Sequence, residues 1–271
     1  MTTARDPLQI ASLIDGVTVP ASKPRRYIGA SSVGNTCMAY LSLSLRGFPD
    51  DQPDSRLRRI FRDGHRIEDQ VVSDLKATGL HIMEIDPMTG KQWEYKLFGG
   101  HVSGHGDGLV ELPSGEVVYL EIKSMNDNKF KECMRHGVRI SHPLYFAQMQ
   151  FMMGLGKLKH AYLVAYNKND GSYYVELVEF DEFYYYGLID KAERVLDGEC
   201  NRQADDLADW RCKSCFKRSA CWGNAVVPLR CSTCEHAKAD KNKGTWWCDK
   251  HSKEANDPCA DHTPWQPEPK K

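Results

Sequence analysis

The sequence has no long hydrophobic run, no excess of one charge and no internal repeat. No stretch of roughly 18 apolar residues occurs, so no transmembrane helix is expected. The segment that begins at Met1 lacks the apolar core of a secretory signal, which predicts an intracellular, cytoplasmic protein. The 36 basic and 37 acidic residues nearly cancel. This balance disfavours a generally basic, DNA-coating protein but allows a local basic groove.

Cysteine, in contrast, is abundant, with ten residues in the chain. Disulfides are rare in a reducing cytosol, so metal ligation explains this number better. All but two of the cysteines fall into two spaced groups. The two outside these groups, Cys133 and Cys200, are interpreted as ordinary thiols.

Two apolar runs near the middle of the chain predict a β-hairpin. A three-residue loop that ends at Gly115 separates them, and Gly115 suits the left-handed position of such a loop. Pairing Leu112 with Glu116 then places Asp107 directly opposite Glu121.

Alternation along the second strand adds a lysine to this pair of carboxylates. Glu121 and Lys123 share one face of the strand, while Ile122 points the other way. The carboxylates of Asp107 and Glu121 and the ammonium group of Lys123 therefore converge on one patch. Paired carboxylates suit Mg²⁺ or Mn²⁺, which prefer oxygen ligands, and a neighbouring lysine can orient water or offset charge on a phosphate.

The remaining pattern predicts an α/β protein with a central mixed β-sheet flanked by helices. Helices are expected at 32–46, 55–78, 127–137, 141–154 and 181–197, and strands at 80–85, 93–98, 102–111, 116–123, 159–166 and 172–179. Residues 1–25 look irregular, 26–225 form the main domain, and 226–271 form a small metal-bound module that the core does not require.

The stretch that ends at Lys123 resembles the core of the PD-(D/E)XK nuclease superfamily. The match is Asp107 followed by Glu121-x-Lys123, with Gly106 where the nominal motif has proline. An exposed hairpin that happens to carry these charges is the alternative interpretation. The resemblance implies a restriction-endonuclease-like core that binds a divalent metal through Asp107, Glu121 and the Ile122 carbonyl. Lys123 would orient water.

Two further residues fit the RecB-like and lambda-exonuclease-like branches of this superfamily. Gly64-x-x-x-Glu68 matches the helix that precedes the hairpin in these branches, which implies Glu68 as a third acidic metal ligand. A surface glutamate paired with a neighbouring arginine is the alternative. Gln148 lies in a very apolar helix where the resembling families place a glutamine near the active site, although Met152 stands where they often have a tyrosine. A plain surface glutamine is the alternative.

The segment before the first helix resembles the phosphate-binding segment of lambda-type exonucleases. The resemblance implies that Arg26 and Ser31 hold a terminal phosphate, and a simple helix N-cap is the alternative for the serine. Arg62 and Arg66 form a basic flank on the helix that carries Glu68, and we expect them to contact DNA.

The first cysteine group resembles the iron–sulfur staple of AddB-type and CRISPR-adaptation nucleases. One cysteine precedes the nuclease-like block and three follow it; they are Cys37, Cys212, Cys215 and Cys221. Four thiolates suit a [4Fe–4S] cluster. Zinc on the same thiolates is one alternative, and Cys37 as a buried apolar thiol is another.

The second cysteine group has the spacing of a closed structural zinc site. Its members are Cys231, Cys234, Cys248 and Cys259. His251 or His262 could replace one of them. Metal would supply much of the folding free energy of so short a segment.

Taken together, these residues predict a metal-dependent DNA nuclease. The resemblance implies an exonuclease that acts on DNA ends in phage or bacterial recombination and repair, with a single-strand annealing or recombination protein as a partner. A structure-specific endonuclease of the same fold and a non-catalytic, DNA-binding or partner-recruiting protein are the two rivals. Digestion of circular DNA would favour the endonuclease.

Overall fold

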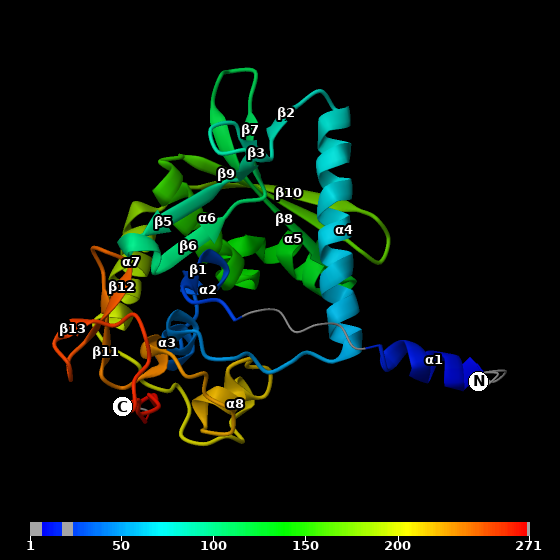
Figure 1. Cartoon of the computed structure of the whole chain (residues 1–271). Coiled ribbons are helices and arrows are strands. Elements are labelled where there is room, and N and C mark those ends of the chain that lie inside the picture. Colours follow the sequence, from blue (N-terminus) through cyan, green and yellow to red (C-terminus); the bar gives the residue numbers. More distant parts are fainter. Residues whose placement is uncertain (1–6, 18–23, 270–271) are drawn as a thin grey trace.

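The structure is a computed structural model that describes residues 7–17 and 24–269. Its centre is a five-stranded mixed sheet with helices on both faces, which confirms the predicted α/β class (Figure 1). The strand order is β10 (Tyr173–Glu179), β9 (His160–Asn167), β8 (Val117–Met125), β7 (Gly108–Glu111) and β2 (His81–Met83). Strands β8 and β9 are parallel, and the other neighbouring pairs are antiparallel. Helices α5 (Asp127–Ser141) and α6 (Pro143–Gly156) form the crossover that a parallel pair requires.

Side-chain alternation along β8 supplies both hydrophobic layers of the molecule. Leu120 and Ile122 pack with helix α4 (Ser55–Ala77) on one face of the sheet. Tyr119 and Met125 join the larger core on the other face, which includes the buried residues of α6. Helix α4 begins at its N-cap Asp54, whose side chain accepts a hydrogen bond from the Leu57 amide.

The strand predicted at 102–111 is instead two strands that belong to different sheets. Strand β6 (Val102–His105) pairs with β1 (Ile28–Gly29) and β5 (Glu94–Leu97), whereas β7 belongs to the central sheet. The chain bends between them at Gly106, whose amide donates to the Trp93 carbonyl at 2.9 Å. A Cβ at Gly106 would lie 2.8 Å from the Tyr119 ring. This bend places Asp107 at the junction of the two sheets.

The other elements surround this centre. They are α1 (Pro7–Asp15), α2 (Ala30–Val33), α3 (Met38–Arg46), β3 (Ile85–Asp86), β4 (Lys91–Gln92), η1 (Phe98–Gly100), α7 (Glu182–Leu196), η2 (Trp210–Cys212), α8 (Arg218–Cys221), η3 (Cys231–Thr233), β11 (Ala237–Asp240), β12 (Thr245–Cys248) and β13 (Lys253–Glu254). Irregular structure was expected for residues 1–25, and this expectation is wrong for α1. The helix contacts the start of α4, where the Ser55 hydroxyl donates to the Asp15 carbonyl at 2.6 Å.

The single helix predicted at 32–46 is also wrong, because it breaks into α2 and α3. A side chain at Gly34 would collide with Ala147, 2.5 Å from an added Cβ, so the chain passes α6 too closely for a regular helix. The Asn35 side chain then accepts the Cys37 amide at 2.8 Å, which competes with helical bonding. Cys37 therefore lies at the N-cap of α3, and Gly47 ends that helix in the left-handed region.

The C-terminal segment packs closely on the main domain. The Arg46 side chain of α3 is buried and donates to the carbonyls of Ser232, Cys234 and Ala237 at 3.0–3.1 Å. Its guanidinium carbon also lies 5.0 Å from the Trp246 ring centroid.

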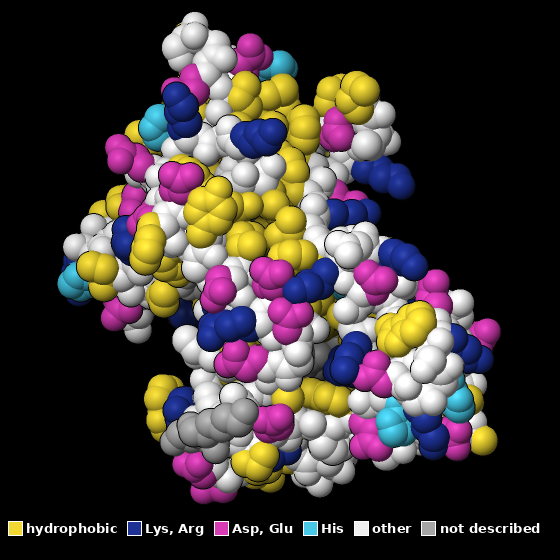
Figure 2. Space-filling view, turned by 90° about the vertical axis from the view of Figure 1, so that its left-hand side faces the viewer, with side chains coloured by type: hydrophobic (Ala, Val, Ile, Leu, Met, Phe, Trp, Pro, Cys, Tyr) yellow, Lys and Arg dark blue, Asp and Glu magenta, His cyan; other side chains and the backbone are white. Residues whose placement is uncertain are grey.

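The surface and helices give two further observations. Figure 2 shows acidic and basic side chains intermixed over the lower part of one face, with hydrophobic side chains gathered above them. This face therefore presents no field of one sign.

Among the described residues, no helix combines the length and the apolar character needed to cross a membrane.

Candidate metal-dependent active site

The hairpin register is the one predicted from the sequence. Gly108 pairs with Leu120, and Leu112 donates its amide to the Glu116 carbonyl at 2.8 Å. Asp107 continues this register to a position opposite Glu121, just before β7 begins. Its Oδ2 accepts the Ile122 amide at 2.8 Å, which holds the carboxylate against β8.

Glu121 is completely buried beneath this site. Its Oε2 accepts a hydrogen bond from the Tyr119 hydroxyl, and Lys123 forms an ion pair with its Oε1. Burial raises the pKa of Glu121 to about 7, and the Asp107 charge adds to this effect while Lys123 opposes it. Burial alone would lower the pKa of Lys123, but the carboxylates of Glu121 and Asp107 outweigh it and raise the pKa. Lys123 is thus held as a cation.

A cleft of about 380 Å³ brings the other predicted residues to this point. Glu68 lines it from α4 and Gln148 from α6, beside Asp107 and Lys123. Burial raises the pKa of Glu68, and the Asp107 carboxylate raises it further, so the two acidic groups repel each other. His65 also lines the cleft, but its side chain is largely exposed.

The two glutamines of α6 have different surroundings. Gln150 is buried and bonds to backbone on both sides, donating to the Glu179 carbonyl and accepting the Asp181 amide, each at 2.8 Å. Gln148 faces the cleft and hydrogen-bonds the Tyr119 hydroxyl. Gln150 is therefore structural. Gln148 is available to the site, and Met152 packs against the strand at Gly104.

The donor set fits a divalent cation. Glu121 Oε1 is buried, and the Lys123 ammonium group is its ion-pair partner. Glu68 and Asp107 repel each other, and burial raises the pKa of Glu121. A bound cation would therefore stabilise the charged form of all three carboxylates. The amide and carbonyl of one strand residue point to the same side, so the Ile122 carbonyl also points toward Asp107.

The predicted phosphate-binding residues are only partly brought into the cleft. Ser31 lines it, but the arginine beside it is Arg25, whose Nη1 donates to Ser31 Oγ at 3.3 Å. Arg26 instead lies against Gly47, outside the cleft. Sequence reasoning missed Arg25 because adjacent arginines give no sign of which one faces inward. Arg62 and Arg66 do not line the cleft, and Arg62 is 73% exposed beside Asp63.

The four cysteines of the first group line one narrow pocket between α3 and the segment around α8. Burial raises the pKa of the Cys215 thiol to about 11, and nearby Cys37, Cys221 and Cys212 raise it as well. Arg202 also lines the pocket, and its side chain donates to the Cys221 carbonyl at 2.7 Å. Thiols gathered in this way suit a shared metal centre, since coordination would stabilise their thiolates.

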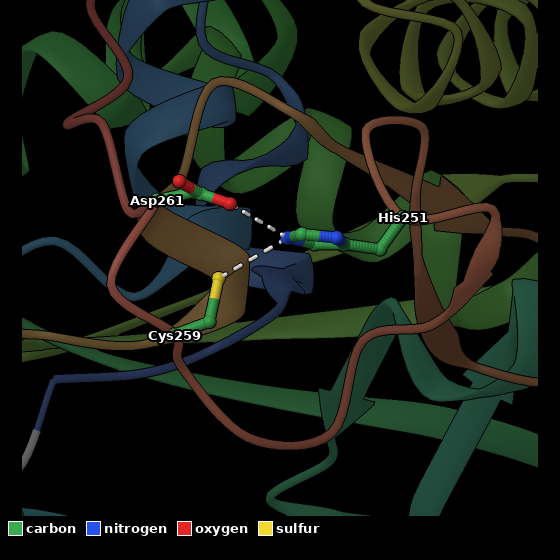
Figure 3. A group of neighbouring side chains, drawn as sticks. All are labelled: His251, Cys259 and Asp261. Carbon is green, nitrogen blue, oxygen red and sulfur yellow. Dashed lines mark hydrogen bonds and ion pairs between the residues drawn. The ribbon is translucent and has the colours of Figure 1, made fainter.

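The second group also meets at one pocket, with additional donors. Cys231, Cys234, Cys248 and Cys259 line it together with His251, His262 and Asp261. Figure 3 shows His251 Nε2 between Cys259 Sγ at 3.5 Å and an oxygen of Asp261 at 3.2 Å.

His251 and His262, two of the three histidines that line this pocket, differ in their contacts. His262 Nε2 lies 3.1 Å from the Thr233 hydroxyl. Of the two histidines considered from the sequence, His251 is therefore the one beside a cysteine sulfur. Asp261 was missed, since a single aspartate in a charged segment carries no spacing signal.

No family model and no curated protein matches this sequence. Among solved structures, the chain is similar to the alkaline exonuclease LHK-Exo from Laribacter hongkongensis, with 21% identity and a TM-score of 0.46 over 64% of this chain and 88% of that one. A phage-related exonuclease from Haemophilus somnus 129PT matches with 14% identity and a TM-score of 0.41, over 65% and 91%. Likeness at this level bears on neither activity nor substrate, which have to be inferred from the site itself.

Proposed function

We propose that this protein is a metal-dependent DNA nuclease that hydrolyses phosphodiester bonds. One observation carries the proposal: Glu68, Asp107, Lys123 and Gln148 line a single cleft, with Glu121 directly beneath Lys123. They come from α4, α6 and the hairpin, and buried apolar layers hold each element in place. A chance surface hairpin would not gather these groups or bury Glu121 completely.

Each residue has a role that follows from its surroundings. Glu68, Asp107, Glu121 and the Ile122 carbonyl would hold Mg²⁺ or Mn²⁺. When bound, such a cation lowers the pKa of water and offsets charge on a phosphate. Lys123, held as a cation by Glu121, would orient the attacking water and neutralise the phosphate. Gln148 would help to position the phosphate through its side-chain amide.

We further propose that the substrate is a DNA end. Arg25 and Ser31 lie in the same cleft as the carboxylates, where a guanidinium and a hydroxyl can hold a terminal phosphate. This arrangement supports an exonuclease. From the sequence resemblance alone, we propose that it serves recombination or repair in a phage or bacterial setting, with an annealing or recombination protein as a partner.

End-labelled linear duplex and covalently closed circular DNA, incubated with Mg²⁺, test both proposals. We expect cleavage of the linear DNA only, abolished by Asp107→Ala or by EDTA. Asp190→Ala is a matched control, since Asp190 is an exposed carboxylate on α7 that pairs with Arg194. Full activity of Asp107→Ala would overturn the nuclease proposal, whereas digestion of circular DNA would replace the exonuclease with an endonuclease.

We also propose that the cysteine groups hold two different metals. The first would bind a [4Fe–4S] cluster through Cys37, Cys212, Cys215 and Cys221. The second would bind zinc through Cys231, Cys234, Cys248 and Cys259, with His251 adjacent. Protein purified without oxygen should be brown and contain about four irons, and Cys215→Ser should lose them. Colourless protein with two zinc ions would assign zinc to both groups.

A further inference from the structure

Tyr119 is, among the described residues, the largest side chain that is fully buried, and it carries a polar group. It lies on β8 between the two neighbouring strands, opposite Leu109 of β7 and Ala161 of β9. Phenylalanine would fill the same space, so packing does not account for the hydroxyl. A buried hydroxyl needs hydrogen-bond partners because water cannot reach it. The partners of this hydroxyl therefore indicate what it does.

Both partners of the Tyr119 hydroxyl belong to the proposed active site. The hydroxyl donates a hydrogen bond to Glu121 Oε2. Its second partner is the side chain of Gln148, which lines the cleft. Since a hydroxyl has one proton to donate, its oxygen accepts from the Gln148 amide. The amide thus fixes the direction in which the Tyr119 hydroxyl donates.

The two oxygens of the Glu121 carboxylate therefore have different surroundings. Oε2 is held by the buried hydroxyl, whereas Oε1 pairs with Lys123, which lines the cleft. Asp107 is arranged in a similar way, because its Oδ2 accepts the Ile122 amide at 2.8 Å. Each of the two carboxylates thus has one oxygen committed to a protein donor, which leaves the other as the better metal ligand.

One oxygen from each carboxylate suits a small cation better than a large one. Mg²⁺ requires octahedral geometry and usually keeps several waters beside one or two carboxylates. Ca²⁺ takes roughly six to eight oxygens, and a carboxylate can supply two of them. A site that withholds one oxygen of each carboxylate therefore gives Ca²⁺ fewer ligands than it prefers.

We propose that Tyr119 is a positioning residue that sets the metal selectivity of the active site. Its hydroxyl holds Glu121 Oε2 and leaves Oε1 for the cation, which favours Mg²⁺ and Mn²⁺ over Ca²⁺. The proposal rests on the proposed nuclease function and specifies how that site selects its cation. The Ile122 amide acts on Asp107 in the same way, but only the hydroxyl can be removed by a substitution.

Isothermal titration calorimetry with MgCl₂ and with CaCl₂ tests the proposal on the full chain, after dialysis to remove free cations. Heat that remains in the Asp107→Ala protein comes from other sites and is subtracted. Loss of an outer partner typically weakens metal binding ~10–100-fold, so Tyr119→Phe should weaken Mg²⁺ binding by at least about tenfold. Ca²⁺ gains the released Oε2 of Glu121, so its affinity should hold or rise. The ratio of Mg²⁺ to Ca²⁺ affinity should therefore fall about tenfold.

Tyr174→Phe is the matched control. Tyr174 also donates to Oε2 of the glutamate two residues ahead, Glu176, at 3.2 Å. This pair lies on the edge strand β10, and Tyr174 does not line the cleft. Both substitutions keep the ring and remove one hydroxyl, but only Tyr119→Phe should change the affinity ratio. Gln148→Met is a second test variant: it removes the amide that orients the hydroxyl and should lower the ratio by a smaller factor.

The outcomes separate the role of Tyr119 from the function on which it rests. An unchanged ratio in Tyr119→Phe protein that is folded by circular dichroism and binds Mg²⁺ through Asp107 would overturn the positioning role and leave the nuclease untouched. Absence of Asp107-dependent binding of either cation by the wild type would overturn the metal site and this proposal together. Tyr119-dependent selectivity without DNA cleavage by the wild type would overturn the nuclease and keep the positioning role.

Discussion

At the scale of single residues, the buried carboxyl of Glu121 should make the metal-free protein sensitive to pH. Burial raises its pKa from 4.5 to about 7. Between these values the folded state keeps a proton that the unfolded chain has released. The free energy of unfolding should therefore fall as the pH rises across this range, by up to about 3 kcal/mol.

Melting temperatures measured in EDTA from pH 4.5 to pH 7.5 test this expectation. Glu121→Gln should remove the fall, since its amide does not titrate. Mg²⁺ should raise the wild-type melting temperature more at high pH, where it need not displace the proton. A wild-type profile that matches the variant across the whole range would show that Glu121 is not buried as a carboxyl.

Lys123 has a structural role and a proposed chemical role, and mutations can separate the two. Lys123→Met removes the ammonium group that pairs with the buried Glu121 carboxylate. This loss should cost about 3–5 kcal/mol of stability. The double variant Glu121→Gln/Lys123→Met removes both charges and should recover most of that loss. Neither variant should cleave DNA, because the lysine and a proposed metal ligand are gone. Cleavage by the double variant at the wild-type rate would contradict the assigned roles.

At the scale of elements, the bend between β6 and β7 explains why glycine stands where the nominal motif has proline. The Gly106 amide donates to Trp93, and proline has no such donor. Any side chain would also press on the buried Tyr119 ring, which in turn bonds Glu121. The glycine therefore supports the position of Glu121.

Gly106→Ala should lower the free energy of unfolding by about 1–3 kcal/mol through overpacking. It should also reduce the cleavage rate, because Tyr119 would shift under Glu121. Gly187→Ala is the matched control: a Cβ at Gly187 in α7 meets nothing within 4 Å. That change should be neutral or stabilising by up to about 1 kcal/mol. Denaturant unfolding of both variants checks the pair, and equal effects would contradict the close approach.

At the scale of the whole molecule, Arg46 joins the main domain to the C-terminal segment. It lies between two rings, 5.0 Å from Trp246 and 4.6 Å from Trp265, and donates to three carbonyls of the segment. Phe48 also packs on Trp265, with centroids 6.0 Å apart. Removal of residues 226–271 would expose this buried surface. We therefore expect the truncated core to be less stable than the full chain, contrary to the independence expected from composition.

Arg46→Met should destabilise the full chain by about 2–4 kcal/mol, because buried carbonyls lose their charged donor. It should also make the segment after Val227 accessible to limited proteolysis. Arg194→Met, a change at a half-exposed arginine of α7, provides the control and should have little effect. Protection from protease equal to that of wild type would show that Arg46 does not hold the segment in place.

The hairpin and its register could be predicted from the sequence alone. Local rules were sufficient there: alternation sets which strand residues share a face, and a left-handed glycine sets the turn. Long-range packing decided the rest. The break before Cys37 comes from α6, and the inward turn of Arg25 rather than Arg26 comes from the shape of the cleft. The docking of the C-terminal segment on Arg46 depends on residues nearly 200 positions apart, and no local pattern encodes such a contact.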